Sequence, residues 1–434
     1  MVITIVLSAI TCILMILAVL LLPKIKIGKV VLSSYWVVTL LGALTLILLG
    51  LVDVAEVTGA LLADTSINPL KILVLFISMT LMSIFLDELG FFRYLASITL
   101  KKAKNGQFKL FLYLYLTVSI LTVFTSNDII VLSFTPFICY FAKNAKINAI
   151  PYLAAEFVAA NTWSMALIIG NPTNIYLSTA LGIGFVDYLG VMIIPTLIAG
   201  ATAFGRLCLV FGKYLRQPIS GEAEDINLGD KTLLIVGIAH LAICTLLLAI
   251  GSYINIEMWL VSLCSVVSLV VVTIIISIVR REKPTLLANT LRRGPYELIP
   301  FVLSMFVIIV ALDSAGVTNL IAGALGEGDL IFKYGITSFV ASNLINNIPM
   351  SVLFSSILSS LGAVEGLTGA VFATVVGSNL GAFMTPIGAL AGIMWGSILN
   401  EHGHKFGYLD FLKIGVTIAI PTLLMALLGL SIVL

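Results

Sequence analysis

A short polar stretch between two uncharged apolar segments carries the side chains best suited to chemistry in this sequence. It reads Phe-Thr-Ser-Asn-Asp-Ile over residues 124–129. The segment before it has no charged residue after Lys109, and the segment after it has none before Lys143. Each segment is shorter than the roughly 20 residues that a straight helical membrane crossing needs. We therefore expect a re-entrant hairpin over residues 108–142, with Asn127 and Asp128 at its tip.

Two acidic side chains are candidates for carrying a coupling ion. A carboxylate at membrane depth is costly and marks a functional site by default. Asp128 lies at the predicted tip, where a bound H⁺ or Na⁺ would neutralise it, and a structural pair with a lysine such as Lys143 is the alternative. Glu156, about two turns into the next apolar segment, is the second candidate, although it could also snorkel or pair at the membrane surface.

The same kinds of interruption occur at three further places. Residues 331–361 form a second pair of apolar arms around Ile-Asn-Asn-Ile-Pro at 345–349. Two other apolar segments are interrupted by Gly-Asn-Pro-Thr-Asn at 170–174 and by Met-Thr-Pro-Ile-Gly at 384–388. Glycine and proline in these positions do not continue a helix. The sequence therefore predicts two hairpins and two broken helices.

Helix breaks expose unpaired N–H groups at one end and unpaired C=O groups at the other. The N–H groups attract anionic or oxygen-rich ligands, and the C=O groups attract cations. Asparagine offers both a donor and an acceptor. The predicted solute- or ion-binding residues are Thr125, Ser126, Asn127, Asp128, Asn171, Thr173, Asn174, Asn346, Asn347, Asn379 and Thr385. The alternative for each is a structural hydrogen bond between helices. Apart from Lys109 and Lys333 near the outer ends of two arms, the arms and breaks contain no lysine or arginine. A neutral solute, or one bound together with cations, therefore fits more easily than a multiply charged anion.

Composition places these elements in a membrane. Of the 434 residues 60% are hydrophobic and only 10% are charged, and the mean hydropathy is +1.17. These values are typical of an all-α polytopic membrane protein, here with about ten transmembrane helices. The expected crossings are residues 2–22, 34–51, 70–86, 150–169 with a resumption at 175, 187–211, 232–250, 258–279, 297–312, 367–400 with its break, and 411–434. The mixture of apolar and polar residues at 91–100 and at 317–325 predicts two short amphipathic helices.

Several classes of protein are not expected from this composition. The five cysteines all lie in apolar segments and none has a Cys-x-x-Cys spacing, so we expect neither a disulfide framework nor a metal site. No nucleophile triad, metalloprotease motif or P-loop is present, so an enzyme is not expected. Nucleic acid is not an expected partner, and no cofactor is expected beyond a coupling ion, H⁺ or Na⁺. The first apolar segment lacks a basic start and a cleavage site, which predicts a retained span.

The order of these features in residues 1–216 recurs in residues 231–434, across a polar linker at 217–230. Asp-Glu-Leu-Gly at 87–90 matches Asp-Ser-Ala-Gly at 313–316, and Asn161 and Gly170 are spaced like Asn379 and Gly388. Lysines flank the first hairpin, and mostly acidic residues flank the second. By the positive-inside rule this predicts two inverted repeats, with the first hairpin entering from the cytoplasm and the second from outside. Paired interrupted segments point to the midplane site of a transporter.

Three motifs together resemble a known group. They are Ser126-Asn127-Asp128 with the downstream Thr135-Pro136, Gly170-Asn171-Pro172-Thr173-Asn174, and Gly377-Ser378-Asn379-Leu380-Gly381 with Thr385-Pro386 and Trp395. The pattern resembles the ion transporter superfamily, and most closely its arsenite permease (ArsB) branch. The resemblance implies a multi-pass protein of the cell (plasma) membrane that exports arsenite or antimonite in exchange for protons. It also implies that Asn127, Asp128, Asn171, Thr173, Asn346, Asn347, Asn379 and Thr385 line the site.

The sequence is also compatible with other functions. The alternatives are a Na⁺-coupled symporter of di- or tricarboxylates or oxyanions, a Na⁺/H⁺ antiporter, and a channel. Dicarboxylate symporters of the superfamily carry Ser-Asn-Thr at both tips, whereas this chain has Asp128 in the first and Ile-Asn-Asn in the second. We expect alternating access, in which the hairpins and broken helices move against a scaffold of the remaining spans. The expected partners are a small anion or metalloid solute and the lipid bilayer, while a homodimer and a soluble ATPase subunit are left open.

Overall fold

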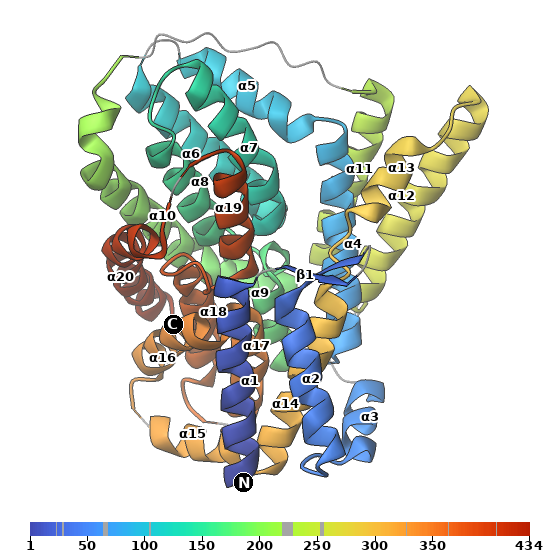
Figure 1. Ribbon diagram of the computed structural model, residues 1–434, viewed down its shortest axis with the longest axis vertical. Coiled ribbons are helices and arrows are strands. Elements are labelled where there is room, and N and C mark those ends of the chain that lie inside the picture. Colours follow the sequence, from blue (N-terminus) through green and yellow to red (C-terminus); the bar gives the residue numbers. More distant parts are fainter. Residues whose placement is uncertain are drawn as a thin grey trace.

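Apolar helices make up nearly all of this chain. The structure is a computed structural model and describes residues 1–22, 24–27, 30–63, 68–103, 106–218, 229–251, 256–326, 328–362, 364–404 and 406–434. Helices α1 (Val2–Leu21) and α2 (Ser34–Leu48) are joined by a small antiparallel hairpin of β1 (Lys24–Ile27) and β2 (Val30–Ser33), in which Ile25 pairs with Leu32. We did not expect this hairpin, and α2 ends at residue 48 rather than 51. The protein is an all-α polytopic membrane protein (Figure 1).

Seven of the described helices are long and apolar enough to cross a membrane. They are α1, α4 (Pro69–Glu88), α6 (Gln107–Phe124), α10 (Phe185–Leu215), α11 (Lys231–Gly251), α12 (Met258–Arg280) and α20 (Tyr408–Val433). An eighth is formed if α14 (Leu298–Ser314) is taken with α15 (Val317–Leu325), to which it is bent by 75°. In the apolar stretch of α4, 78% of the residues are buried within the protein, whereas the share is 22% in α11 and in α12. Helix α4 is therefore central, and α11 and α12 face lipid.

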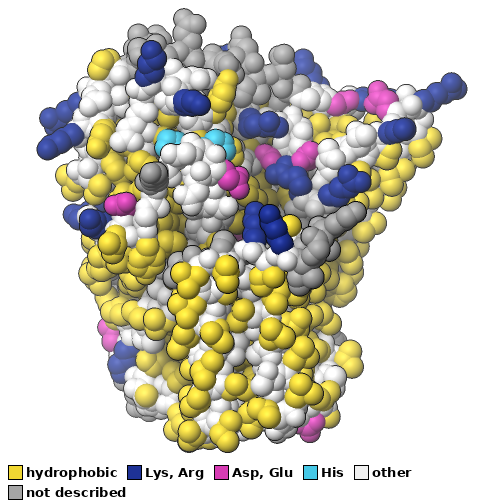
Figure 2. Space-filling model, viewed as in Figure 1, with side chains coloured by type: hydrophobic (Ala, Val, Ile, Leu, Met, Phe, Trp, Pro, Cys, Tyr) yellow, Lys and Arg dark blue, Asp and Glu magenta, His cyan; other side chains and the backbone are white. Residues whose placement is uncertain are grey.

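The other expected crossings are shorter or broken. Helix α2 has 15 residues and α18 (Leu367–Gly381) has 15. The two hairpins are α6 with α7 (Asn127–Asn144), and α16 (Leu330–Ile345) with α17 (Asn347–Ser360). The broken helices are α8 (Ile150–Trp163) with α9 (Pro172–Ala180), and α18 with α19 (Leu390–Glu401). In Figure 2 hydrophobic side chains cover the lower part of the visible face, and most lysines and arginines lie above them.

The two halves repeat the same order of elements with opposite direction. The series α4 to α10 recurs as α14 to α20, with α5 (Phe91–Ala103) matching α15. Gly90 and Gly316 follow α4 and α14, and both have φ of +76°, a left-handed conformation in which glycine carries no steric penalty. Figure 1 places α5 at one end of the molecule and α15 at the other, so the repeats are inverted. The boundaries 1–216 and 231–434 stay a prediction, and residues 219–228 of the predicted linker lie outside the described residues.

Short helices brace the ends of α4 and α14, each from the other half of the chain. Arg293, directly after α13 (Thr285–Arg292), pairs with Asp87 at 2.8 Å and with Glu88 at 2.5 Å. Glu56 on α3 (Val54–Leu62) accepts a hydrogen bond of 2.8 Å from Ser314. Neither α3 nor α13 was expected from the sequence. Each brace has a counterpart across the repeat, although the residue types differ.

The opposite ends of α4 and α14 are tied to the other half as well. Lys71 on α4 pairs with Glu257, the residue before α12, at 2.7 Å. Glu297, the residue before α14, accepts a hydrogen bond of 2.6 Å from Ser33, the residue before α2. Both halves therefore contribute to one scaffold, in which α4 and α14 are held at both ends.

The described helices form two groups. The scaffold group contains α1 to α4 and α11 to α14, and the site group contains α6 to α10 and α16 to α20. Each hairpin packs on the broken helix of the other half, α7 on α19 and α17 on α9, while α10 packs on α20. We expected α10 and α20 in the scaffold, which was wrong, because they pack on α8 and α18. Helices α5 and α15 contact both groups.

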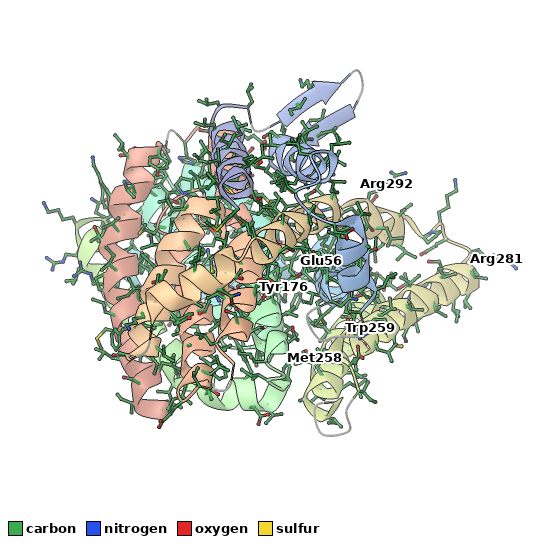
Figure 3. All side chains as sticks on the ribbon, turned by 90° about the horizontal axis from the view of Figure 1, so that it is seen from below. Glu56, Tyr176, Met258, Trp259, Arg281 and Arg292 are labelled. Carbon is green, nitrogen blue, oxygen red and sulfur yellow. The ribbon has the colours of Figure 1, made fainter. Side chains whose placement is uncertain are left out.

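The contact between the scaffold group and the site group is largely apolar, and its exception is the acid Asp128, which lies near Tyr35 of α2. Among the hydrogen bonds, ion pairs and ring contacts whose two partners are both described, none joins the two groups. A small pocket at this boundary is lined by Ile72, Leu73, Phe76, Pro172, Tyr176, Leu298, Val302 and Ile348, from α4, α9, α14 and α17. Figure 3 shows Tyr176 near the centre of the molecule and Arg281 at the far tip of α12.

The first helix break begins at Ser164, not at Gly170 as the sequence suggested. Helix α8 ends at Trp163, and only a short 3₁₀ turn, η1 (Ile168–Gly170), precedes α9. The amide of Asn174 donates to the carbonyl oxygens of Ser164 at 2.8 Å and of Leu167 at 3.0 Å, so these oxygens need no helical partner. A Cβ on Gly170 would lie 2.2 Å from the oxygen of Ser164, so this position requires glycine.

Close packing of α16 on α18 gives a first test of the fold. A Cβ added at Gly377 would lie 2.1 Å from Ser338 Oγ and 2.3 Å from the carbonyl oxygen of Gly335. Small residues permit such close approach of helices in membranes. We expect Gly377→Ala to destabilise the protein by about 1–3 kcal/mol, the usual cost of overpacking. Thermal unfolding of the purified protein measures this.

Gly396 provides the matched control for that substitution. A Cβ at Gly396 meets nothing within 4 Å, although this glycine also lies in a helix of the site group. Gly396→Ala should leave the midpoint of unfolding unchanged or raise it slightly. Equal stability of the two variants would contradict the close packing of α16 on α18.

Candidate functional site

The tip of the first hairpin is closed by its own side chains. Helix α6 ends at Phe124 and α7 begins at Asn127. Thr125 Oγ1 donates to the carbonyl of Leu121 at 2.8 Å, and Ser126 Oγ accepts from the amide N–H of Asp128 at 3.3 Å. Ser126 is therefore the N-cap of α7.

Asn127 carries a free acceptor into the interior of the site group. Its Nδ2 donates to Asn161 Oδ1 on α8 at 3.0 Å, and Asn161 Nδ2 donates to the carbonyl of Phe157 at 2.8 Å. The Oδ1 atom of Asn127 is buried and has no hydrogen-bond partner among the described residues. Buried polar groups are normally satisfied, so an unpaired oxygen here suits a ligand hydroxyl or a cation.

Asp128 faces the scaffold group from the same tip. It is partly exposed, and it lies close enough to Tyr35 of α2 for an electrostatic interaction. Tyr35 is also 3.4 Å from Glu297. The ion pairs between described residues do not include Asp128 with Lys143, the structural alternative that we considered. Asp128 is thus an acid at the boundary between the two groups of helices.

The second tip is a single residue in an unusual conformation. Asn346 alone separates α16 from α17, and its φ is +72°, which few residues other than glycine and asparagine adopt. Its Oδ1 accepts from the N–H of Ile348 at 3.3 Å, and its Nδ2 donates to the carbonyl of Ile387 at 3.0 Å. The N–H of Asn347 donates to the carbonyl of Gly388 at 3.0 Å. This tip is therefore fastened to the broken helix of its own half.

One amide joins the two broken helices. Asn379 Oδ1 accepts from Ser164 Oγ at 2.9 Å and from Asn171 Nδ2 at 3.0 Å. Its Nδ2 donates to Asn174 Oδ1 at 2.7 Å and to the carbonyl of Val375 at 2.9 Å. The side chain of Asn379 is fully buried, and these bonds use its two donors and both acceptor positions of its oxygen. We call Ser164, Asn171, Asn174 and Asn379 the amide junction.

The remaining predicted residues lie beside the amide junction. Asn171 is the N-cap of α9 and accepts from the N–H of Thr173 at 3.2 Å. Thr173 Oγ1 is 3.5 Å from Asn174 Oδ1. Thr385, in the second break, donates to Asn343 Oδ1 on α16 at 2.7 Å and does not bond to the junction.

The structure groups the predicted residues into three clusters, two of which are linked. The first tip bonds to Asn161, the amide junction lies at the centre, and the second tip bonds to the second break. Ser164 connects the first two clusters, because its Oγ also lies 2.9 Å from the carbonyl of Asn161. Ser164 and Asn343 also belong to these clusters, although they were not predicted from the sequence. Asn161 was recognised through its spacing to Gly170 but was not chosen as a site residue.

Glu156 lies apart from these clusters. It is on α8, five residues before Asn161, and its side chain is fully buried. Thr135 Oγ1 on α7 lies 3.1 and 3.2 Å from its two oxygens. The structure therefore separates the two acids that we expected to serve coupling, with Asp128 at the tip and Glu156 inside the bundle.

The clusters are electrically neutral apart from Asp128. The hydrogen bonds of the three clusters, among the described residues, join amides, hydroxyls and backbone groups. Among the described residues, no group of three His, Cys, Asp or Glu side chains is placed to hold a metal ion. Such an arrangement can bind a small hydroxylated solute by exchanging one set of neutral hydrogen bonds for another.

Comparison with known proteins agrees with this architecture. Residues 1–377 match the family model described as Citrate transporter, CitMHS. An arsenical pump membrane protein of Escherichia coli is 26% identical over 371 residues, which cover 82% of this chain and 85% of that protein. A 46 kDa membrane protein of Mycobacterium leprae is 24% identical over 375 residues, which cover 82% of this chain and 84% of that protein. The crystal structure of the YdaH transporter of Alcanivorax borkumensis is similar with a TM-score of 0.55 at 16% identity, covering 99% of this chain and 97% of that chain.

The amide junction makes a prediction about transport. Asn379→Ala removes every side-chain bond of Asn379 and leaves buried groups of Ser164, Asn171 and Asn174 without this partner. Each such buried group costs about 1–3 kcal/mol when unsatisfied. We expect transport to fall by about tenfold or more, while the protein still inserts into the membrane. Initial rates in vesicles, normalised to the amount of protein, measure this.

Asn144→Ala is the matched control, because Asn144 is exposed at the end of α7. It should transport at the wild-type rate. An Asn379→Ala protein with undiminished rates would show that the junction is not part of the transport site.

Proposed function

Since this chain belongs to the citrate transporter family, CitMHS, we propose that it is a proton-coupled exporter of arsenite, antimonite or a similar small inorganic solute. Its class as a multi-pass membrane transporter, rather than an enzyme, follows from the family and the fold. The substrate and the coupling ion are our proposal. They rest on the neutral chemistry of the three clusters and on the position of Asp128.

The neutrality of the clusters is the observation that supports the substrate. The tips and breaks are lined by amides and hydroxyls, and Asp128 is their one acid. Arsenous acid is uncharged at neutral pH and carries three hydroxyl groups, each able to donate and accept. Amides such as Asn127, with an unpaired Oδ1, match those hydroxyls without needing a counter-charge. The relatives named as arsenical pump membrane proteins support the same choice.

The apolar boundary between the two groups of helices supports alternating access. Movement of one group past the other breaks no hydrogen bond or ion pair between described residues, because those bonds lie within the groups. The site group holds both tips and both breaks, so it would carry the solute as a unit. Helices α5 and α15 contact both groups and would act as flexible connections.

Asp128 is the proposed coupling residue. It lies at the first tip, at the boundary with the scaffold group and near Tyr35. Crossing the membrane with an ionised carboxylate is costly unless the carboxylate is protonated or the hydroxyl groups of a bound solute donate hydrogen bonds to it. A proton and the solute would then compete for the site, which gives exchange of one for the other. This mechanism requires neither a soluble ATPase subunit nor a dimer partner.

A carboxylate symporter is the second candidate. The family description names citrate, and helix N-termini such as those of α7 and α9, with their caps Ser126 and Asn171, can bind carboxylate groups. A multiply charged anion would need co-bound cations, because no lysine or arginine takes part in the hydrogen bonds that the described residues of the clusters make.

The test of the proposal is uptake of As(III) into everted vesicles with an imposed pH gradient. Wild-type vesicles should accumulate As(III) when the interior is acidic, because export in the cell becomes uptake in this orientation. Asp128→Asn should lose gradient-driven accumulation by about tenfold or more, because its side chain cannot release a proton. Asp187→Asn is the matched control, since Asp187 is exposed at the start of α10.

Two outcomes would contradict the proposal. Wild-type rates in Asp128→Asn would remove the coupling role. Absence of As(III) uptake, together with Na⁺-dependent uptake of labelled citrate in proteoliposomes, would favour the carboxylate symporter.

A further inference from the structure

Glu156 is a fully buried acid without a positively charged partner. Its side chain is 0% exposed, whereas the nearly buried Asp87, at 6%, is paired with Arg293. The ion pairs between described residues do not include Glu156. An ionised carboxylate in such a place is strongly disfavoured unless a cation or several donors compensate it.

The surroundings of Glu156 come from three helices and are neutral. Among the described residues Thr135 on α7 is its one hydrogen-bond partner of standard geometry, and the indole of Trp395 on α19 lies beside the carboxyl group. Trp395 Nε1 is buried and has no partner of standard hydrogen-bond geometry. The indole ring packs against Phe157 at 5.1 Å and Phe411 of α20 at 5.5 Å, measured between ring centroids.

Other titratable groups near α8 do not supply a charge. Cys139, one turn after Thr135 on α7, lies close enough to Glu156 for an electrostatic interaction and is itself buried. From α6, Tyr115 bonds to the carbonyl of Gly200 on α10 at 2.7 Å. Tyr152 of α8 bonds to Gln107 at 2.9 Å. These groups are all neutral in their ordinary forms.

The inverted repeat shows that the fold does not need an acid at this position. Glu156 precedes Asn161 by five residues, and Thr374 precedes Asn379 by five. Thr374 is equally buried and bonds only to the carbonyl of Ala370 in its own helix, at 2.7 Å. The counterpart of Trp395, seven residues after Gly388, is Leu177, seven after Gly170. The second half therefore fills the equivalent place without a carboxyl group.

We propose that Glu156 is a second proton-binding site of the transporter, separate from Asp128 and occupied by a proton in the conformation described here. The protonated acid is neutral and needs only the Thr135 hydroxyl as a partner. The site is closed by α7 of one half and α19 of the other, so it opens only if these two helices separate locally within the site group. Loss of the proton then changes the charge of the site by one unit, and water at the membrane surface takes up that proton.

Its position between the tip and the end of the bundle fits this role. Thr135 is seven residues from Asp128 along α7, a distance of about 10 Å on the helix axis. In the other direction α19 runs from Trp395 to its end at Glu401. The proposal rests on proton coupling as the proposed function, and it assigns the place where a second proton is held.

Infrared spectroscopy of the full-length protein in liposomes tests the protonation without any substrate. A protonated carboxyl group gives a C=O stretching band that ionised carboxylates and amides do not give. At neutral pH the wild-type protein should show such a band, and Glu156→Gln should lose a component of it that Asp128→Asn keeps. Glu401→Gln, a change of an exposed acid on α19, is the control and should keep the band. A carboxyl band that is unchanged in Glu156→Gln, or the lack of any such band in the wild type, would overturn the proposal.

A second variant keeps the test valid if Glu156→Gln folds poorly. Thr135→Val removes the hydrogen bond to Glu156 and leaves the carboxyl group in place. The band should then shift to higher frequency, as it does when a carboxyl group loses a hydrogen bond, and it should not disappear. An unshifted band in Thr135→Val would also overturn the assignment to Glu156.

Transport measurements separate this proposal from the proposed function. With As(III), Glu156→Gln should lower gradient-driven uptake by about tenfold and leave As(III)/As(III) exchange at equal pH near the wild-type rate. Wild-type values for both processes would show that the Glu156 proton does not couple to transport. If the wild type moves no As(III) but the infrared band behaves as expected, the proposed substrate is wrong and the proton site stands.

Discussion

Backbone groups in the interior of a membrane must find hydrogen-bond partners within the protein, and this constraint governs the structure. The breaks after Trp163 and Gly381 would leave carbonyl and N–H groups unpaired if the chain ran through lipid. Amide side chains satisfy them instead. Asn174 bonds to the carbonyls of Ser164 and Leu167, and Asn346 bonds to the carbonyl of Ile387. The residues that make the breaks foldable are therefore the same kind of residue that can bind a hydroxylated solute.

The distribution of polar contacts divides the described helices into two groups, which the proposed mechanism assigns to a frame and a moving part. Inside the scaffold group, ion pairs such as Arg293 with Asp87 hold α4 at both ends, and hydrogen bonds of Ser314 and Glu297 hold the two ends of α14. Inside the site group, Asn379 joins the two broken helices by directional bonds. The boundary between the groups is formed by apolar side chains, among them Phe76 and Ile348. Apolar contact is non-directional, so it can be exchanged along a sliding surface at little cost.

The sequence predicted the spans, the hairpins and the inverted repeat, because hydropathy, breaker residues and charge are local or periodic signals. The start of the first break was wrong by several residues, because it depends on Asn174 bonding back to Ser164, ten residues earlier. The environment of Glu156 could not be predicted, since it depends on Trp395 from α19, in the other half of the chain, as well as on Thr135 from the preceding helix. The expected membership of α10 and α20 in the scaffold was wrong for the same reason.

Several residues of the first half bond to residues of the second half, which the ribosome synthesises later. Asn171 and Asn174 form hydrogen bonds with Asn379, and Asp87 forms an ion pair with Arg293, so each has a partner that is synthesised later. Until those residues leave the ribosome, the first half holds a broken helix and a buried carboxylate whose partners do not yet exist. Its final packing must therefore follow translation of the second half, and a chain truncated before residue 379 would be a natural target for membrane quality control.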